Sequence, residues 1–104
     1  MKDKTMYKET TRQWIAEMKA EGKLQDMDGD ALNRLEDEYA KILEEKFEEA
    51  VKRQLAPSGK VAEFERMLIY DGQYMNKYLN QTIPGYPAFK MEIFAQLRKE
   101  ITGI

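Results

Sequence analysis

The chain has 104 residues, of which 42% are hydrophobic and 35% are charged, and it contains neither histidine nor cysteine. Those two side chains supply most proton transfer near neutral pH and most transition-metal ligands, so the composition speaks against a zinc centre, a cysteine nucleophile and a disulfide scaffold. The length and apolar content predict one globular domain, residues 1–104. No apolar run approaches the ~20 residues of a membrane span and the polar start indicates no signal peptide, so we expect a soluble, cytoplasmic protein.

The net charge of −2 is unevenly distributed along the chain. Residues 26–55 carry ten acidic and five basic side chains, whereas the segments before and after them are weakly basic. Because no basic patch stands out, the sequence does not favour a nucleic-acid partner.

Apolar residues recur at steps of three and four along most of the chain, which is the period of an amphipathic α-helix, and no useful length alternates with the period of a strand. Glycine and proline interrupt this pattern and divide it into segments. We therefore predict an all-α fold: a compact bundle of four to five helices, with one long central helix and no sheet. The expected helices cover residues 5–21, 30–55, 60–70, 73–81 and 87–102.

The break at Gly72 leaves two alternatives open. A glycine inside a helix costs about 1 kcal/mol relative to alanine, so residues 60–81 form either one helix that tolerates Gly72 or two helices that meet there. At other helix ends we expect Asp26 or Asp28 to cap the second helix and Ser58 to cap the third, because short polar side chains accept hydrogen bonds from the free N–H groups of a first turn.

The centre of the core is predicted from the position of each apolar residue within its stripe. Side chains in the middle of a stripe are covered on both sides, whereas those beside a break meet solvent. The five residues expected at the centre are Phe47, Phe64, Leu68, Phe94 and Leu97.

The first helix is joined to the helical body, residues 24–102, by a stretch rich in glycine and aspartate, which makes it semi-independent. Its face of Trp14, Ile15 and Met18 is too apolar to remain in water, so it covers its own domain, a second copy of the chain or a partner protein. We favour packing on its own domain, with a homodimer through this helix as the next alternative.

Several features of the body follow one another in a recognisable order: the acidic helix Glu36–Gln54, the Ser58–Leu68 segment with Phe64, the pair Tyr78-Leu79, the Ile83-Pro84 break and the closing amphipathic helix. In this order, residues 24–102 are similar to a small all-helical family of unknown function from poorly characterised bacteria. The resemblance implies a helical body of bacterial or phage-like origin and brings no activity with it.

An acidic stretch of the long helix is the first further candidate for binding a partner. Its members are Glu44, Glu45, Glu48 and Glu49. We interpret it mainly as solvated helix surface, and alternatively as an electrostatic surface for a partner protein.

Tyrosines form the second further candidate. Tyr70, Tyr74 and Tyr78 share a face if one helix spans Gly72. We interpret them as core residues with hydroxyl groups at the rim, and alternatively as a binding surface, because tyrosine is enriched at protein interfaces.

No metal site and no cofactor are expected. Asp26, Asp28 and Asp30 resemble the start of a calcium loop, but the glycine at the sixth position and the glutamate at the twelfth are missing. The paired carboxylates of the acidic stretch lack the histidines of a di-metal bundle.

Catalysis is also not indicated, since the only serine, Ser58, has no histidine to activate it. The residue types allow one arrangement, a dyad of Ser58 with Lys60. We predict a non-enzymatic helical module that binds another protein and no membrane. One alternative is an acidic mimic or inhibitor that occupies a basic site on a partner. Another is a small enzyme that uses only carboxylate, lysine and tyrosine groups.

Overall fold

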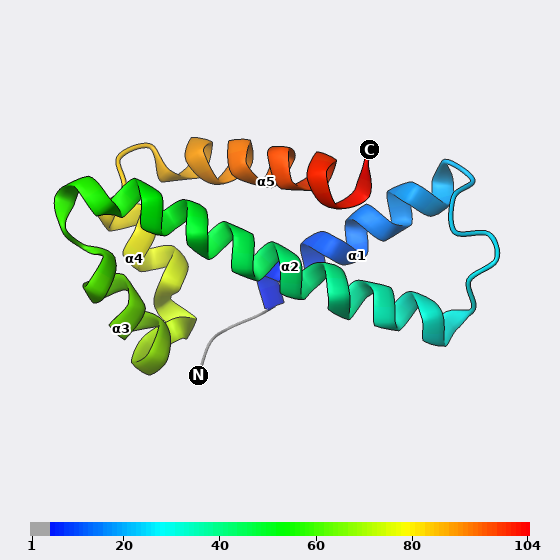
Figure 1. Cartoon of the computed structure of the whole chain (residues 1–104), viewed down its shortest axis with the longest axis horizontal. Helices are drawn as coiled ribbons and strands as arrows, with labels where there is room; N and C mark the ends of the chain where they lie inside the picture. Colours follow the sequence, from blue (N-terminus) through cyan, green and yellow to red (C-terminus); the bar gives the residue numbers. More distant parts are fainter. Residues whose placement is uncertain (1–4) are drawn as a thin grey trace.

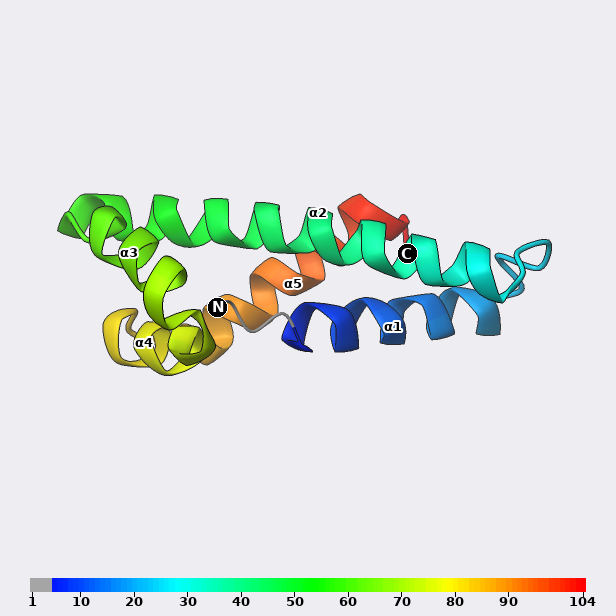
Figure 2. The same ribbon diagram turned by 90° about the horizontal axis from the view of Figure 1, so that it is seen from below.

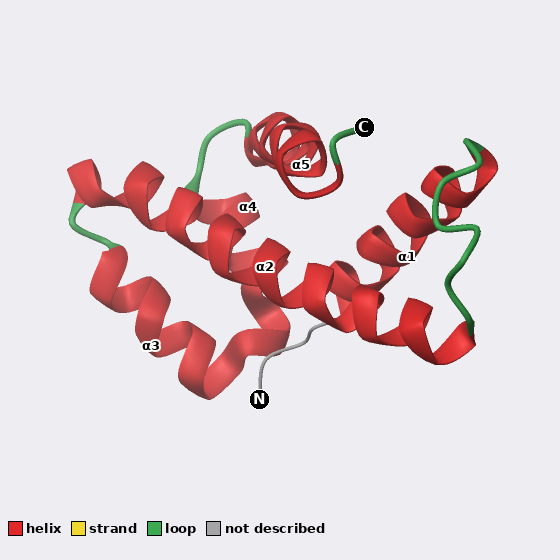
Figure 3. Cartoon of the chain, turned by 45° about the vertical axis from the view of Figure 1, so that its right-hand side comes forward, coloured by secondary structure: helices red, strands yellow, loops and turns green. Residues whose placement is uncertain are grey.

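The computed structural model describes residues 5–104, which form an all-α bundle with no strand in that range (Figure 3). The predicted fold class and the long central helix are confirmed. The helices are α1 (Thr5–Ala20), α2 (Gly29–Leu55), α3 (Val61–Asp71), α4 (Met75–Thr82) and α5 (Tyr86–Thr102), with 3₁₀ turns at Ala56–Ser58 and Gly72–Tyr74.

The long helix α2 is the element on which the others pack. α1 runs back along the first half of α2, α5 lies along another side of it, and α3 and α4 fold back from its C-terminal end (Figure 1). In the perpendicular view, α2 runs along one side of the molecule and α1 and α4 lie on the other (Figure 2). The bundle is therefore elongated, with extents of 47 × 25 × 17 Å.

Local side-chain chemistry sets both ends of α2. Asp28 is the N-cap, as predicted, and its carboxylate accepts a hydrogen bond of 2.8 Å from the backbone N–H of Ala31. At the other end Pro57 lies in the 3₁₀ turn and Gly59 adopts a φ of 71°, a backbone conformation that favours glycine, so the chain leaves the helix here.

The prediction that Ser58 caps α3 is wrong. Its hydroxyl donates a hydrogen bond of 2.9 Å to the carbonyl of Leu55, in the turn that closes α2. The residue before α3 is Lys60, which makes no side-chain cap. The left-handed Gly59 turns the chain between Ser58 and α3, so the serine belongs to the preceding helix end.

The chain bends at Gly72, so residues 60–81 form two helices and not one. Gly72 is buried in the 3₁₀ turn that separates α3 from α4. The bend brings Met75 into the core, where its sulfur accepts a hydrogen bond of 3.6 Å from the hydroxyl of Tyr7. α4 thereby closes on α1, a contact that a continuous helix would not make.

Four of the five residues predicted at the centre of the core are buried: Phe47, Phe64, Leu68 and Leu97. Phe47 has no exposed surface and its ring packs edge-on against two others, with centroid distances of 6.2 Å to Tyr7 and 5.1 Å to Phe94. This cluster joins α1, α2 and α5.

Phe94 is the exception, since it is only half-buried. One side of its ring faces Phe47, while the Nζ atom of Lys90 lies 5.6 Å from the ring centroid. The prediction of a central position for Phe94 is therefore wrong, because α5 lies at the outside of the bundle and its stripe meets α2 along one edge.

The apolar face of α1 packs on its own domain, as favoured from the sequence: Trp14, Ile15 and Met18 are all buried. Ion pairs fasten the helix at both sides, from Arg12 to Glu36 of α2 at 3.0 Å and from Glu17 to Arg98 of α5 at 2.7 Å. In the folded chain this face is covered by the rest of the domain. A homodimer through this helix stays a prediction.

Alanine substitutions at Phe64 and Phe94 should differ in their effect on stability. Phe64→Ala should lower the free energy of unfolding by about 3–5 kcal/mol, because a fully buried ring is lost. Phe94→Ala should cost clearly less, since part of its ring already meets solvent. Urea denaturation followed by circular dichroism measures both values, and equal losses would contradict the difference in burial.

Deleting residues 1–22 should lower the melting temperature and promote aggregation. The deletion removes the Tyr7 ring from Phe47 and uncovers the apolar residues of α2 beneath α1. Differential scanning calorimetry with light scattering tests this expectation. A truncated chain that stays monomeric and equally stable would mean that α1 contributes nothing to the domain.

Candidate functional site

The four glutamates of the predicted acidic stretch do not form one continuous surface. Glu44, Glu45 and Glu48 line a hollow of about 470 Å³, whereas Glu49 lines a different hollow of about 300 Å³. Their exposure differs as well, because Glu48 is buried and Glu44 half-buried, while Glu45 and Glu49 are exposed. The stretch is therefore divided between two places along α2.

Basic side chains stand among these carboxylates. In the first hollow the Nζ atom of Lys8 lies 3.8 Å from a carboxylate oxygen of Asp37, and in the second that of Lys46 lies 4.0 Å from Glu100. Lysine and arginine side chains therefore share both hollows with the glutamates of the acidic stretch. The first hollow is lined by Tyr7, Lys8, Asp37, Ala40, Lys41, Glu44, Glu45 and Glu48, and the second includes Lys46, Glu49, Arg53 and Glu100.

Tyr7 borders the first hollow but holds its hydroxyl inside the core. Only 1% of the residue is exposed, and the hydroxyl donates to the sulfur of Met75. Burial, and then the negative charges of Glu48 and Glu44, raise the pKa of Tyr7 above its ordinary value. The phenol therefore stays protonated in the physiological range and acts as a structural donor.

The dyad of Ser58 and Lys60 that the residue types allow is not formed. The Ser58 hydroxyl bonds the Leu55 carbonyl, and no hydrogen bond joins it to Lys60. Within residues 5–104 the structure gathers no group of three carboxylates that could hold a metal ion, and Asp28 serves as a helix cap. No helix in the same range is long and apolar enough to cross a membrane.

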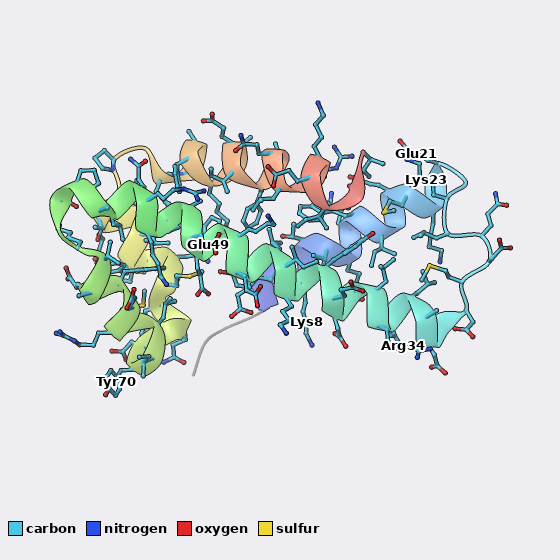
Figure 4. The ribbon with its side chains drawn as sticks, viewed as in Figure 1. Lys8, Glu21, Lys23, Arg34, Glu49 and Tyr70 are labelled. Carbon is cyan, nitrogen blue, oxygen red and sulfur yellow. The ribbon has the colours of Figure 1, made fainter. Side chains whose placement is uncertain are left out.

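The tyrosines separate into an exposed pair and an inward-facing residue. Tyr70 is 73% exposed and Tyr74 is 53% exposed. Ile69, which directly precedes Tyr70 in α3, is 68% exposed. We call these three residues, Ile69, Tyr70 and Tyr74, the α3–α4 corner. Figure 4 shows Tyr70 at the end of the molecule, with its ring directed away from the body.

Tyr78 does not belong to this surface, because a shared face of three tyrosines required one helix across Gly72 and the chain forms two helices there. Its ring stacks on Phe64 at 6.3 Å, with 22° between the ring planes. The hydroxyl is buried near Glu63 and Thr82 without a well-formed hydrogen bond, and burial raises its pKa. The bend at Gly72 turns α4 so that Tyr78 faces α3 while Tyr70 and Tyr74 face solvent.

Sequence reasoning missed Ile69, which contributes as much to the corner as either tyrosine. Ile69 directly follows the buried Leu68, so the amphipathic pattern of the sequence places it at the edge of the same apolar stripe. Helical geometry is the signal that identifies Ile69 as exposed. Its side chain lies about 100° around the helix axis from Leu68, outside the face that Phe64 and Leu68 share.

The chain matches no family model, no curated protein and no solved structure in the three comparisons made. The resemblance of residues 24–102 to a helical family of unknown function stays a prediction.

The stability of the protein should fall as the pH rises from about 10 to 12. Burial raises the pKa of Tyr86 to about 12, from an ordinary value near 10, so the folded chain keeps a proton that the unfolded chain releases in this window. Stability from this group is fully present below pH 10 and is lost as the pH passes the folded pKa.

Urea denaturation between pH 9 and 12 measures this dependence. Tyr86→Phe should reduce the slope without abolishing it, because the buried Tyr7 also has a raised pKa and contributes in the same direction. The control is Tyr70→Phe, which changes an exposed tyrosine and should leave the slope as in the wild type. A slope that Tyr86→Phe leaves unaltered would contradict the assignment.

Proposed function

We propose that this chain is a protein–protein interaction module whose contact surface is the α3–α4 corner. One observation carries the proposal: of the four large hydrophobic side chains that are mostly exposed among the described residues, three fall within residues 69–74 of the chain, namely Ile69, Tyr70 and Tyr74. The fourth, Met91, lies apart on α5. Clustered apolar exposure marks interaction sites, whereas single exposed residues are ordinary.

The residue types of the corner fit this role. Tyrosine offers a large, rigid contact area with few rotatable bonds and a polar tip, and it is among the residues that most often dominate binding energy. The exposed parts of the three side chains amount to about 300–450 Å². An area of that size is typical of the largest patch on a monomer, which is often functional.

The acidic mimic is less well supported. Its glutamates are divided between two hollows, and lysine or arginine side chains line both of them. An effective mimic of a polyanion needs uncompensated charge on one surface. The enzymatic alternative has no supporting geometry in the Ser58 region, where the serine hydroxyl is bound to a carbonyl.

Substituting the corner should abolish capture of a partner without affecting the fold. Ile69→Ser and Tyr70→Ser remove exposed apolar area, so we expect unchanged circular dichroism and a loss of the bound protein in affinity capture from source-cell lysate. Met91→Ser is the matched control, because Met91 is equally exposed but isolated. A partner retained by both corner variants, or lost with Met91→Ser alone, would refute the proposed surface.

A further inference from the structure

A third hollow, of about 270 Å³, lies between α4 and the start of α5, two helices that contact each other (Figure 2). We call it the α4–α5 hollow, and it is lined by Asn76, Asn80, Tyr86, Pro87 and Lys90. Asn76 and Asn80 are four residues apart in α4, and Tyr86 and Lys90 are four residues apart in α5. Each helix therefore presents two polar side chains on one face, and the two faces meet at the hollow.

The amide of Asn76 is held in place by two neighbours. Tyr86 is buried, with 3% of its surface exposed, and its hydroxyl donates a hydrogen bond of 2.9 Å to the Oδ1 atom of Asn76. The Nδ2 atom of Asn76 donates to the sulfur of Met6 at 3.6 Å. A side-chain amide has two N–H groups, so a second donor of Asn76 remains for a ligand. The fold orients this donor in advance, which lowers the ordering cost of binding.

Lys90 brings a positive charge to the hollow without a carboxylate beside it. Its side chain is half-buried, and the Nζ atom lies 5.6 Å from the centroid of the Phe94 ring. Lys90 forms no ion pair with any residue from 5 to 104, and burial lowers its pKa. Acidic side chains stand beside the lysines of the other two hollows, whereas the lining of the α4–α5 hollow contains none. The uncompensated charge here is therefore positive.

The number of charges in the hollow defines the class of anion that it suits. A monocarboxylate carries one negative charge, which one ammonium group balances, and its two oxygens accept hydrogen bonds from lysine and amide N–H groups. A phosphate group carries about −1.5 to −2 at pH 7, so one lysine would leave part of its charge uncompensated. The ring of Pro87 and the aliphatic stem of Lys90 add apolar surface that suits a short hydrocarbon tail.

We propose that the α4–α5 hollow binds a small monocarboxylate. The carboxylate pairs with the ammonium group of Lys90 and accepts hydrogen bonds from the amides of Asn76 and Asn80. The short apolar tail of the ligand lies against Pro87. This site is separate from the α3–α4 corner, because no residue of the corner lines the hollow.

Titration of the purified, ¹⁵N-labelled full chain with sodium butyrate, followed by NMR at constant ionic strength, tests the site. We expect saturable shifts of the side-chain amides of Asn76 and Asn80, with a dissociation constant of about 1 mM or lower. Lys90→Gln should weaken binding about tenfold or more, because it removes the charge that pairs with the carboxylate. Lys99→Gln is the matched control: Lys99 is an exposed lysine at the other end of α5, and its variant should bind as the wild type does.

A second variant and a second probe separate the remaining outcomes. Asn80→Ala changes an exposed side chain, so it should leave circular dichroism unchanged and weaken butyrate binding about threefold or more, even if Lys90→Gln disturbs the fold. Inorganic phosphate should bind more weakly than butyrate, and tighter binding of phosphate would show that the ligand class is wrong. Shifts that do not saturate, or equal losses in Lys90→Gln and Lys99→Gln, would refute the site. None of these results bears on the corner, whose test uses a captured protein.

Discussion

The length of α2 is the constraint on which the rest of the structure depends. At 27 residues it extends about 40 Å, whereas α1 has 16 residues and α5 has 17, so neither can cover it alone. Its buried residues all lie between Ala40 and Leu55. The helices that pack against α2 are α1, α3 and α5. The elongated shape follows, because the shorter helices must be distributed along a rod.

The helices α1, α2 and α5 meet at the ring of Phe47. Tyr7 from α1 and Phe94 from α5 both pack against it, and the ion pair between Glu17 and Arg98 links the same two helices directly. α4 joins through Met75, whose sulfur accepts a hydrogen bond from Tyr7. The bundle is thin as a result, and the outer side of α3 is covered by nothing within residues 5–104.

That thinness explains why an apolar corner remains at the surface. A helix packed against one neighbour usually presents polar residues to solvent, but α3 presents isoleucine and tyrosine there. The chain has charged residues in abundance for such positions, as the outer faces of α2 demonstrate. The contrast between the two helices within one chain is the physical basis for interpreting the corner as a contact surface and the exposed Glu45 and Glu49 of α2 as solvated charge.

The sequence by itself determined the fold class and the approximate helix ends, because hydrophobic period, glycine and proline act within a few residues of chain. It left open whether Asp26 or Asp28 caps α2 and whether residues 60–81 form one helix or two. The tertiary structure decided what covers each face. It half-exposes Phe94, turns Tyr78 inward and divides the acidic stretch between two hollows. These outcomes depend on where helices cross and on the bend at Gly72, and residues far apart in the chain set those positions, so no local pattern encodes them.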